Sequence, residues 1–331
     1  MVAEPLHPFV EAYLDHLRSA DKVTTAGTNA TYLGMFTRWL ASQGLALSQD
    51  TITPDVLARF QVHITREYRT KRGGGLLAER SQVTAIIVLR GFFAWLHKRG
   101  LMLFNPAAGL VPPTPAQRLT VAKDHLDLQE AIALVATCAA LVDEAKAGTN
   151  AWALAMRDHA AICLDLATGR RCHGLCGARV ADLDQEQNEI RVEYEKGKTG
   201  RVLPVAAWAV RAVQRYLTQA RPLLLRGKDS PFLFVSQRAV RLCERGFAYL
   251  LDAVVEKTIS RNPDLTALPT KTISTHSLRV TFAATLMFPN GCGIRALNEL
   301  MLHTSLNTTA QYTPIPLEDL RRVLLTTHPR A

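Results

Sequence analysis

Two arginines, two histidines and a tyrosine occupy three short stretches in the second half of the chain. The first stretch contains Arg171, the second contains His276 and Arg279, and the third contains His303 and Tyr312. Guanidinium groups hold phosphate oxygens through bidentate hydrogen bonds, histidines transfer protons, and a tyrosine hydroxyl can attack as a covalent nucleophile. Together these residue types can break a phosphodiester bond without a metal ion.

The spacing of these residues also favours one shared site. His276 and Arg279 are three residues apart, so both can face one phosphate from the start of a helix. His303 follows Arg279 by 24 residues, and Tyr312 follows His303 by nine. A lone histidine on a helix is more often structural, so spacing alone leaves this alternative open for His303.

This order and spacing resembles that of the tyrosine recombinases, the phage integrase family. The stretch from Thr168 to Leu175 resembles the first arginine box of that family, T-G-x-R-x-x-E-L. The resemblance makes Arg171 the catalytic arginine and Arg170 its neighbour. The alternative is that Arg171 is a surface arginine after a helix-ending glycine. The resemblance covers nearly the whole chain, and residues 317–331 resemble the end of a Xer-type recombinase.

Two residues depart from the family pattern. Gly174 stands where the family usually has Glu or Asp, a carboxylate that buttresses the active site. Leu302 stands where the family usually has Gly, directly before the histidine of the third stretch. These departures are the only features that favour a second hypothesis, a DNA-binding protein of the same fold with weak or no cleavage.

Residues 189–205 predict an antiparallel β-hairpin with a basic tip. Apolar residues alternate on both sides of a Lys-Gly-Lys-Thr-Gly turn, which is typical of paired strands. The resemblance puts Lys196 at the catalytic lysine, whose ammonium group protonates the leaving 5′ oxygen. Lys198 is its rival on the same tip and a candidate DNA contact. The alternative is that both lysines only contact phosphate.

The resemblance implies a mechanism with two transfers of phosphate. Tyr312 attacks the scissile phosphate, forms a 3′-phosphotyrosyl bond and frees a 5′ hydroxyl, and the hydroxyl of a partner strand reverses the attack. Arg171 and Arg279 stabilise the charged phosphorane with the help of His303, and His276 is the general base. The bond energy stays in the phosphotyrosine, so no cofactor, nucleotide or metal site is expected.

The first hundred residues show helical periodicity. Helices are predicted from Pro8, over residues 32–40, after an N-cap at Thr53, and over residues 78–98. Phe92 and Phe93 recur at helical spacing, which favours core positions rather than base stacking. A basic segment before the fourth helix supplies the other candidate DNA contacts: Arg66, Arg69, Lys71 and Arg72. The glycines after it predict a turn rather than a phosphate cradle, because no strand precedes them.

A proline-rich segment, residues 111–120, predicts an extended linker between two domains. The predicted domains are a core-binding, DNA-binding domain (1–110) and a catalytic domain (121–331). The resemblance implies a mainly α fold: an N-terminal SAM-like helical core-binding bundle and a C-terminal mixed α-helical domain with a small antiparallel sheet. In the second domain helices are expected over residues 123–140 and 151–168, and from 204 to the end except near 263–275.

Composition narrows the class of partner. Lys and Arg number 39 against 29 Asp and Glu, a net charge of +10, and this balance fits nucleic acid better than a membrane. No apolar run has the length of a membrane span, and no signal peptide is visible. The spacing of the six cysteines is not that of a disulfide framework. Cys172 and Cys176 near His173 match no usual zinc spacing, so we expect buried free thiols and a reducing cytoplasm.

The expected function is site-specific DNA recombination. The expected partner is double-stranded DNA with specific recombination sites, on which four copies of the chain form a homotetramer. The sequence leaves open whether accessory proteins also take part. An apolar stripe after the tyrosine is predicted to dock on a neighbouring copy: Leu317, Leu320, Val323 and Leu324. A type IB topoisomerase-like relaxing activity uses the same chemistry, and the Xer-like tail argues against it.

Overall fold

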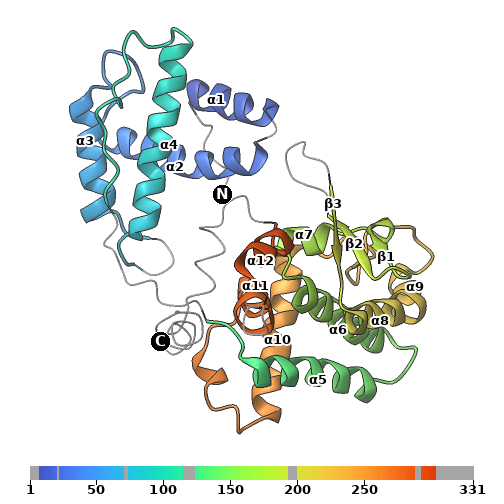
Figure 1. Cartoon of the computed structure of the whole chain (residues 1–331). Coiled ribbons are helices and arrows are strands. Elements are labelled where there is room, and N and C mark those ends of the chain that lie inside the picture. Colours follow the sequence, from blue (N-terminus) through green and yellow to red (C-terminus); the bar gives the residue numbers. More distant parts are fainter. Residues whose placement is uncertain are drawn as a thin grey trace, which may run out of the picture. The chain divides into compact units, whose positions relative to one another are not determined.

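The computed structural model describes residues 7–20, 22–70, 74–114, 124–192, 200–287 and 292–302. The chain divides into two compact units, residues 1–121 and 122–331 (Figure 1). Both are mainly helical, and the second also contains a small antiparallel sheet, which confirms the predicted fold class. Residues 115–120 of the predicted linker lie outside the described residues. The predicted bounds and roles of the two domains stay predictions. None of the described helices is long and apolar enough to cross a membrane.

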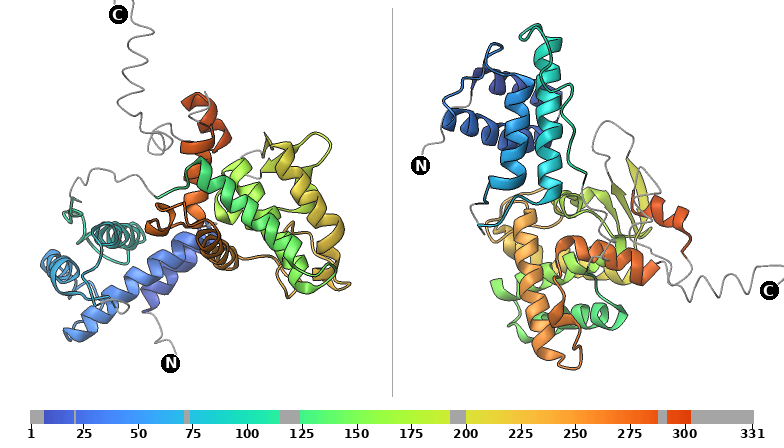
Figure 2. Two further views of the ribbon diagram at one scale, coloured as in Figure 1. Left: turned by 90° about the horizontal axis from the view of Figure 1, so that it is seen from below. Right: turned by 90° about the vertical axis from the view of Figure 1, so that its left-hand side faces the viewer.

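The first unit is a helical bundle with an aromatic core. Its elements are α1 (Pro8–Ser19), α2 (Val23–Ser42), α3 (Pro54–Val62), the π-helical turn η1 (His63–Glu67) and α4 (Glu79–Lys98). The predicted cap at Thr53 is confirmed, since its hydroxyl accepts the Val56 N–H at 3.3 Å. Helix α4 packs against α1 and α2 (Figures 1 and 2). Phe92 and Phe93 are completely buried, as predicted for core residues.

The second unit is built around one buried helix, α6. Its helices are α5 (Leu128–Glu144), α6 (Asn150–Thr168), α7 (Cys172–Gly177), α8 (Ala207–Arg215), α9 (Arg221–Leu225), α10 (Glu244–Arg261), α11 (Thr275–Thr281) and α12 (Ile294–Leu300). Helical turns of other types are η2 (Val180–Asp182), η3 (Tyr216–Ala220), η4 (Leu268–Thr270) and η5 (Phe282–Met287). Helix α6 contacts α5, α8, α9, α10 and α11.

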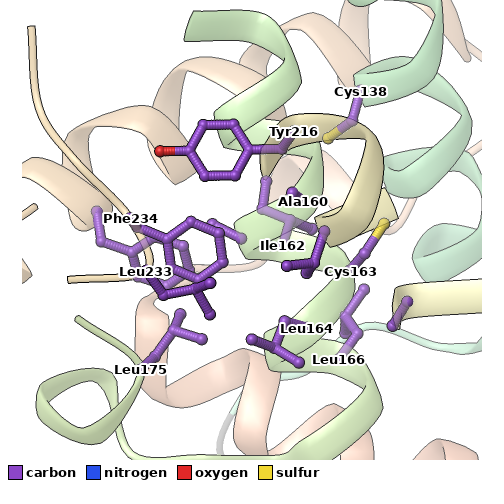
Figure 3. Packing of buried hydrophobic residues seen from close by; sticks show 14 of the residues in the cluster. Cys138, Ala160, Ile162, Cys163, Leu164, Leu166, Leu175, Tyr216, Leu233 and Phe234 are labelled. Atoms are coloured by element: carbon purple, nitrogen blue, oxygen red, sulfur yellow. The ribbon is translucent and has the colours of Figure 1, made fainter. Parts of the chain in front are cut away.

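The side chains of α6 explain its central place. From Ala160 to Leu166, small and aliphatic residues other than Asp165 cover all its sides, and a helix that is apolar nearly all round must be buried. Figure 3 shows Ile162 and Leu164 of α6 packed with Tyr216 and Phe234, all of them completely buried. Burial of each large side chain stabilises the fold by roughly 1.5 to 3 kcal/mol.

The predicted hairpin is confirmed in its strands. Strand β2 (Glu189–Val192) pairs antiparallel with β3 (Arg201–Pro204), with Ile190 opposite Leu203. A short strand that we did not predict, β1 (Leu183–Asp184), pairs with β2, so the sheet has the order β1-β2-β3 within the described residues. The hairpin tip, residues 193–199, lies outside the described residues.

Two predictions for the second domain were wrong in detail. Helix α5 begins at Leu128 rather than 123, because Asp127 and Glu130 form a reciprocal capping box with hydrogen bonds of 2.8 Å. Residues 226–243 are not helical, although we expected helix there. Gly227 and Pro231 interrupt this stretch, and its short buried apolar run, residues 233–235, cannot be told from a helical segment by periodicity alone.

Gly169 ends α6 in a way that another residue cannot. Its φ of +56° is in the left-handed region, and a Cβ built on it would lie 2.7 Å from Cγ of Phe282. Its N–H donates to the carbonyl oxygen of Asp165 at 2.7 Å, which closes the last turn of the helix. Both the backbone angle and the close ring therefore require glycine here.

We expect Gly169→Ala to lower the free energy of unfolding by about 3 kcal/mol, from the left-handed backbone and the displaced ring together. Urea unfolding followed by circular dichroism measures this change. The matched control is Gly177→Ala in α7, where a Cβ would approach nothing closer than Arg241 Nη1 at 4.0 Å. It should leave stability within about 1 kcal/mol. Equal stability of both variants would contradict the proposed constraint.

Candidate active site

Arg279 lies at the centre of the candidate site. Helix α11 begins after Ser274, whose hydroxyl caps the helix together with Ser277, and Arg279 follows within the first two turns. Its side chain is only 3% exposed. Nη1 donates to the carbonyl oxygen of Gly169 at 2.5 Å, and Nη2 donates to that of Met301 at 2.6 Å. The arginine of the second stretch therefore lies directly beside the first arginine box.

The other described candidates surround this guanidinium. Arg171 is exposed and occupies the N-cap position of α7, two residues after Gly169. His276 is half-buried in the first turn of α11. The Cys172 thiol interacts with Thr275, so the starts of α7 and α11 are adjacent. The structure thus brings the Arg171 and His276–Arg279 stretches together from positions more than a hundred residues apart in the chain.

Several predicted site residues lie outside the described residues. These are Lys196, Lys198, His303 and Tyr312 in the catalytic domain and Lys71 and Arg72 in the first unit. The remaining two candidate DNA contacts, Arg66 and Arg69, are exposed. Arg69 forms an isolated antiparallel bridge with Leu76, and the Thr70 N–H donates to the Gly75 oxygen at 2.9 Å, which confirms the predicted turn.

The described chain approaches the third stretch at α12. Met301, which follows α12, supplies the second carbonyl to Arg279, and Leu302 adopts a φ of +53°. The leucine therefore takes the left-handed conformation that glycine adopts most readily. An exposed ion pair of Arg201 with Glu299 connects β3 with α12, so the end of β3 nearest the hairpin tip is next to this helix (Figure 2).

Sequence reasoning missed Asp165 and did not predict that Arg170 is buried. Asp165 of α6 is 0% exposed, and Arg170 is 7% exposed. Burial lowers the pKa of Arg170, whereas Asp182 and Asp165 raise it. A Cβ at Gly174 would lie 3.6 Å from Nη2 of Arg170, so this guanidinium fills the space next to the missing carboxylate. An aspartate within the apolar run of residues 160–166 was the signal that could have found this cluster.

The two cysteines near the box lie in α7. Cys176 is buried, but Cys172 is only half-buried, so the expectation of buried thiols was wrong for Cys172. The two thiols hydrogen-bond to each other, and this bond and burial raise the pKa of Cys176. Among the described residues, no group of three or more His, Cys, Asp or Glu side chains is placed to hold a metal ion.

Known proteins resemble the chain in sequence and in fold. The profile of the phage integrase family matches residues 130–316. The chain is 32% identical to tyrosine recombinase XerD of Corynebacterium glutamicum, over 97% of this chain and 98% of that protein. It is 30% identical to tyrosine recombinase XerC of Pelobacter propionicus, over 99% of this chain and 97% of that protein.

Two solved structures share the fold. XerH site-specific recombinase bound to palindromic difH substrate in a post-cleavage complex has a TM-score of 0.67, with 19% identity over 97% of this chain and 84% of that one. A lambda integrase dimer bound to a COC′ core site has a TM-score of 0.61, with 17% identity over 93% of this chain and 94% of that one. The match of the family profile, the near full-length relatives and the site geometry agree. The chain belongs to the phage integrase family and is a Xer-like tyrosine recombinase.

Proposed function

We propose that this recombinase cuts DNA by attack of Tyr312 on the scissile phosphate, with Arg171 and Arg279 on the non-bridging oxygens. The attack forms a 3′-phosphotyrosyl bond and expels a 5′ hydroxyl. Charge grows on the phosphorane oxygens in the transition state, and preorganised guanidinium groups stabilise that charge most where water is excluded. The burial of Arg279 supports this role, since its position is fixed before DNA arrives.

Proton transfers are assigned to His276 and Lys196, and a supporting contact to His303. His276 removes the proton of the tyrosine hydroxyl, Lys196 protonates the leaving 5′ oxygen, and His303 supports the phosphorane. His276 lies within the first turn of the helix that carries Arg279, which supports its assignment. The hydroxyl of a second strand then attacks the phosphotyrosine and rejoins the DNA.

One observation carries this proposal. The guanidinium of Arg279 hydrogen-bonds to Gly169 within the first arginine box and to Met301 two residues before His303. Two of the three stretches, and the residue that leads toward the third, therefore meet at one cation. A DNA-binding protein without cleavage has no need of this convergence. Leu302 stands where the family usually has glycine, yet its backbone keeps the left-handed conformation. This departure therefore gives little support to the alternative of a DNA-binding protein without cleavage.

We further propose that four copies assemble on two DNA sites in the cytoplasm, and that the C-terminal tail links them. An apolar pocket between α5, α6 and α8 is lined by Ile132, Val135, Leu166 and Trp208, among others. Ile132 is 61% exposed and Trp208 is 40% exposed, which is unusual for large apolar side chains. The predicted apolar stripe of residues 317–324 lies outside the described residues and is the occupant that we assign. Docking of the tail in a neighbouring copy distinguishes this assembly from a type IB topoisomerase-like enzyme, which acts as a monomer.

The unsubstituted protein should form a covalent adduct with DNA, and Tyr312→Phe should bind the same DNA without forming it. A phenyl ring has no oxygen to attack phosphorus. The DNA is obtained by selecting bound sequences from a random pool, and a nicked duplex of that sequence traps the adduct on a denaturing gel. An adduct that persists in Tyr312→Phe would show that another residue is the nucleophile. Tyr249→Phe, an exposed tyrosine of α10, is the matched control and should cleave normally.

Cleavage should continue in EDTA without added nucleotide. The charge on the phosphate is neutralised by arginine and lysine side chains, so no metal is required for that role. Adduct formation is measured with and without the chelator. Loss of activity in EDTA and its return with Mg²⁺ would refute this mechanism.

Ile132→Glu should lower recombination between paired sites by about tenfold or more, because a charge in the pocket opposes docking of an apolar stripe. Affinity for a single site should be unchanged. Val240→Glu, at a side chain that is 57% exposed and not part of the pocket, is the control. Normal recombination by Ile132→Glu would exclude the pocket as the receptor. A lower melting temperature in this variant alone would indicate that the tail packs within its own copy.

A further inference from the structure

One carboxyl group is buried beside the active site without a partner. Asp165 lies in the last turn of α6, and its side chain is 0% exposed. Neither of its oxygens has a hydrogen-bond partner among the described residues. Burial of an uncompensated carboxylate is costly, so such a group is kept where neighbouring charges offset the cost.

The neighbouring charges are two arginines of the site. Burial raises the pKa of the Asp165 carboxyl and Cys172 adds to this rise, whereas Arg279 and Arg170 oppose it. Arg170 is itself buried, and its Nη1 has no hydrogen-bond partner among the described residues. Asp165 and Arg170 are thus two buried groups with unpartnered atoms, and each favours the charged form of the other without a hydrogen bond between them.

Gly174 borders the same guanidinium. A Cβ at this position would lie 3.6 Å from Nη2 and 3.7 Å from Nε of Arg170. A carboxylate on residue 174 would therefore begin next to Arg170, but glycine supplies none. Asp165 brings a carboxyl group to the cluster from α6 instead. The other nearby carboxylate, Asp182, is only half-buried, and its Oδ2 already accepts a backbone N–H at 2.7 Å.

Arg170 connects these buried charges to the backbone that carries Arg171 and binds Arg279. Arg170 lies between Gly169, whose carbonyl holds Arg279, and the exposed Arg171. A shift of the buried Arg170 side chain would move the backbone of residues 169–171. Such a shift would disturb both arginines that we assign to the phosphate, although Asp165 contacts no DNA itself.

We propose that Asp165 is a positioning residue that holds Arg170, and through it residues 169–171, in place of a carboxylate at position 174. This inference rests on the proposed function, because its effect is seen in the rate of cleavage.

Asp165→Asn tests the proposal in the full-length protein. The amide has nearly the same shape but no charge. The rate constant for adduct formation at saturating protein should fall about 10- to 100-fold, the effect of a small misplacement of catalytic groups. The Kd for the selected DNA site should change little. Circular dichroism should show that the variant is folded, because the amide keeps the shape of the carboxyl group.

A second substitution supplies the matched control. Gly174→Glu in the Asp165→Asn background should restore the rate, because it returns a carboxylate to Arg170. Gly174→Gln in that background has the same length and the same gain in helix propensity over glycine, but no charge. It should leave the rate low.

The outcomes separate the inference from the proposed function. A normal cleavage rate in Asp165→Asn, or equal rescue by Glu and Gln, would overturn the inference and leave the proposed function intact. Absence of an adduct with the unsubstituted protein would refute the proposed function and the inference with it. Rescue by Glu alone establishes the positioning role.

Discussion

A buried guanidinium needs acceptors where water cannot supply them, and the catalytic unit meets this need for Arg279 with the ends of two helices. Gly169 and Met301 are the C-cap residues of α6 and α12. Carbonyl groups at a helix C-terminus have no partner within the helix, and they carry the negative end of its dipole. One cation therefore satisfies two helix ends, and α6, α11 and α12 are held at one point.

This contact also dictates how the two helices end. Gly169 has a φ of +56°, and Leu302, directly after Met301, has a φ of +53°. In each case a left-handed residue turns the chain at the helix end whose carbonyl meets Arg279. At Gly169 the approach of Phe282 makes a side chain impossible without movement. At Leu302 a side chain is present, and the left-handed backbone costs roughly 1 to 2 kcal/mol. The turn is kept despite this cost.

Local patterns in the sequence predicted several of the elements, and the family resemblance predicted the chemistry. Helical periodicity placed the start of α1 and both ends of α4 within one residue, and the cap at Thr53 was recognised from its residue type. The alternating pattern around the Lys-Gly-Lys-Thr-Gly turn predicted β2 and β3. The spacing of His276 and Arg279, together with the arginine box, predicted which segments meet, because these residues must reach a single phosphate.

Contacts between distant segments could not be predicted in the same way. The α5 boundary depended on which of several polar residues caps the helix, and residues 233–235 are buried by packing that periodicity does not encode. Nothing local distinguishes the roles of Arg170 and Arg171, two adjacent residues of identical chemistry. Only the fold shows that the first is buried and the second is exposed.

The two departures from the family pattern have different physical consequences. Leu302 changes a side chain but leaves the left-handed backbone, so the contact of Met301 with Arg279 is retained. Gly174 removes a charged group, and a missing charge cannot be replaced by backbone geometry. It must be supplied by another residue or tolerated by the arginine beside it. Arg170 is buried with an unpartnered donor, and Asp165 is buried with two unpartnered acceptors in the same cluster. The charge of each group offsets part of the cost of burying the other. Because both positions bear on Arg170, Asp165 and Gly174 should be varied together.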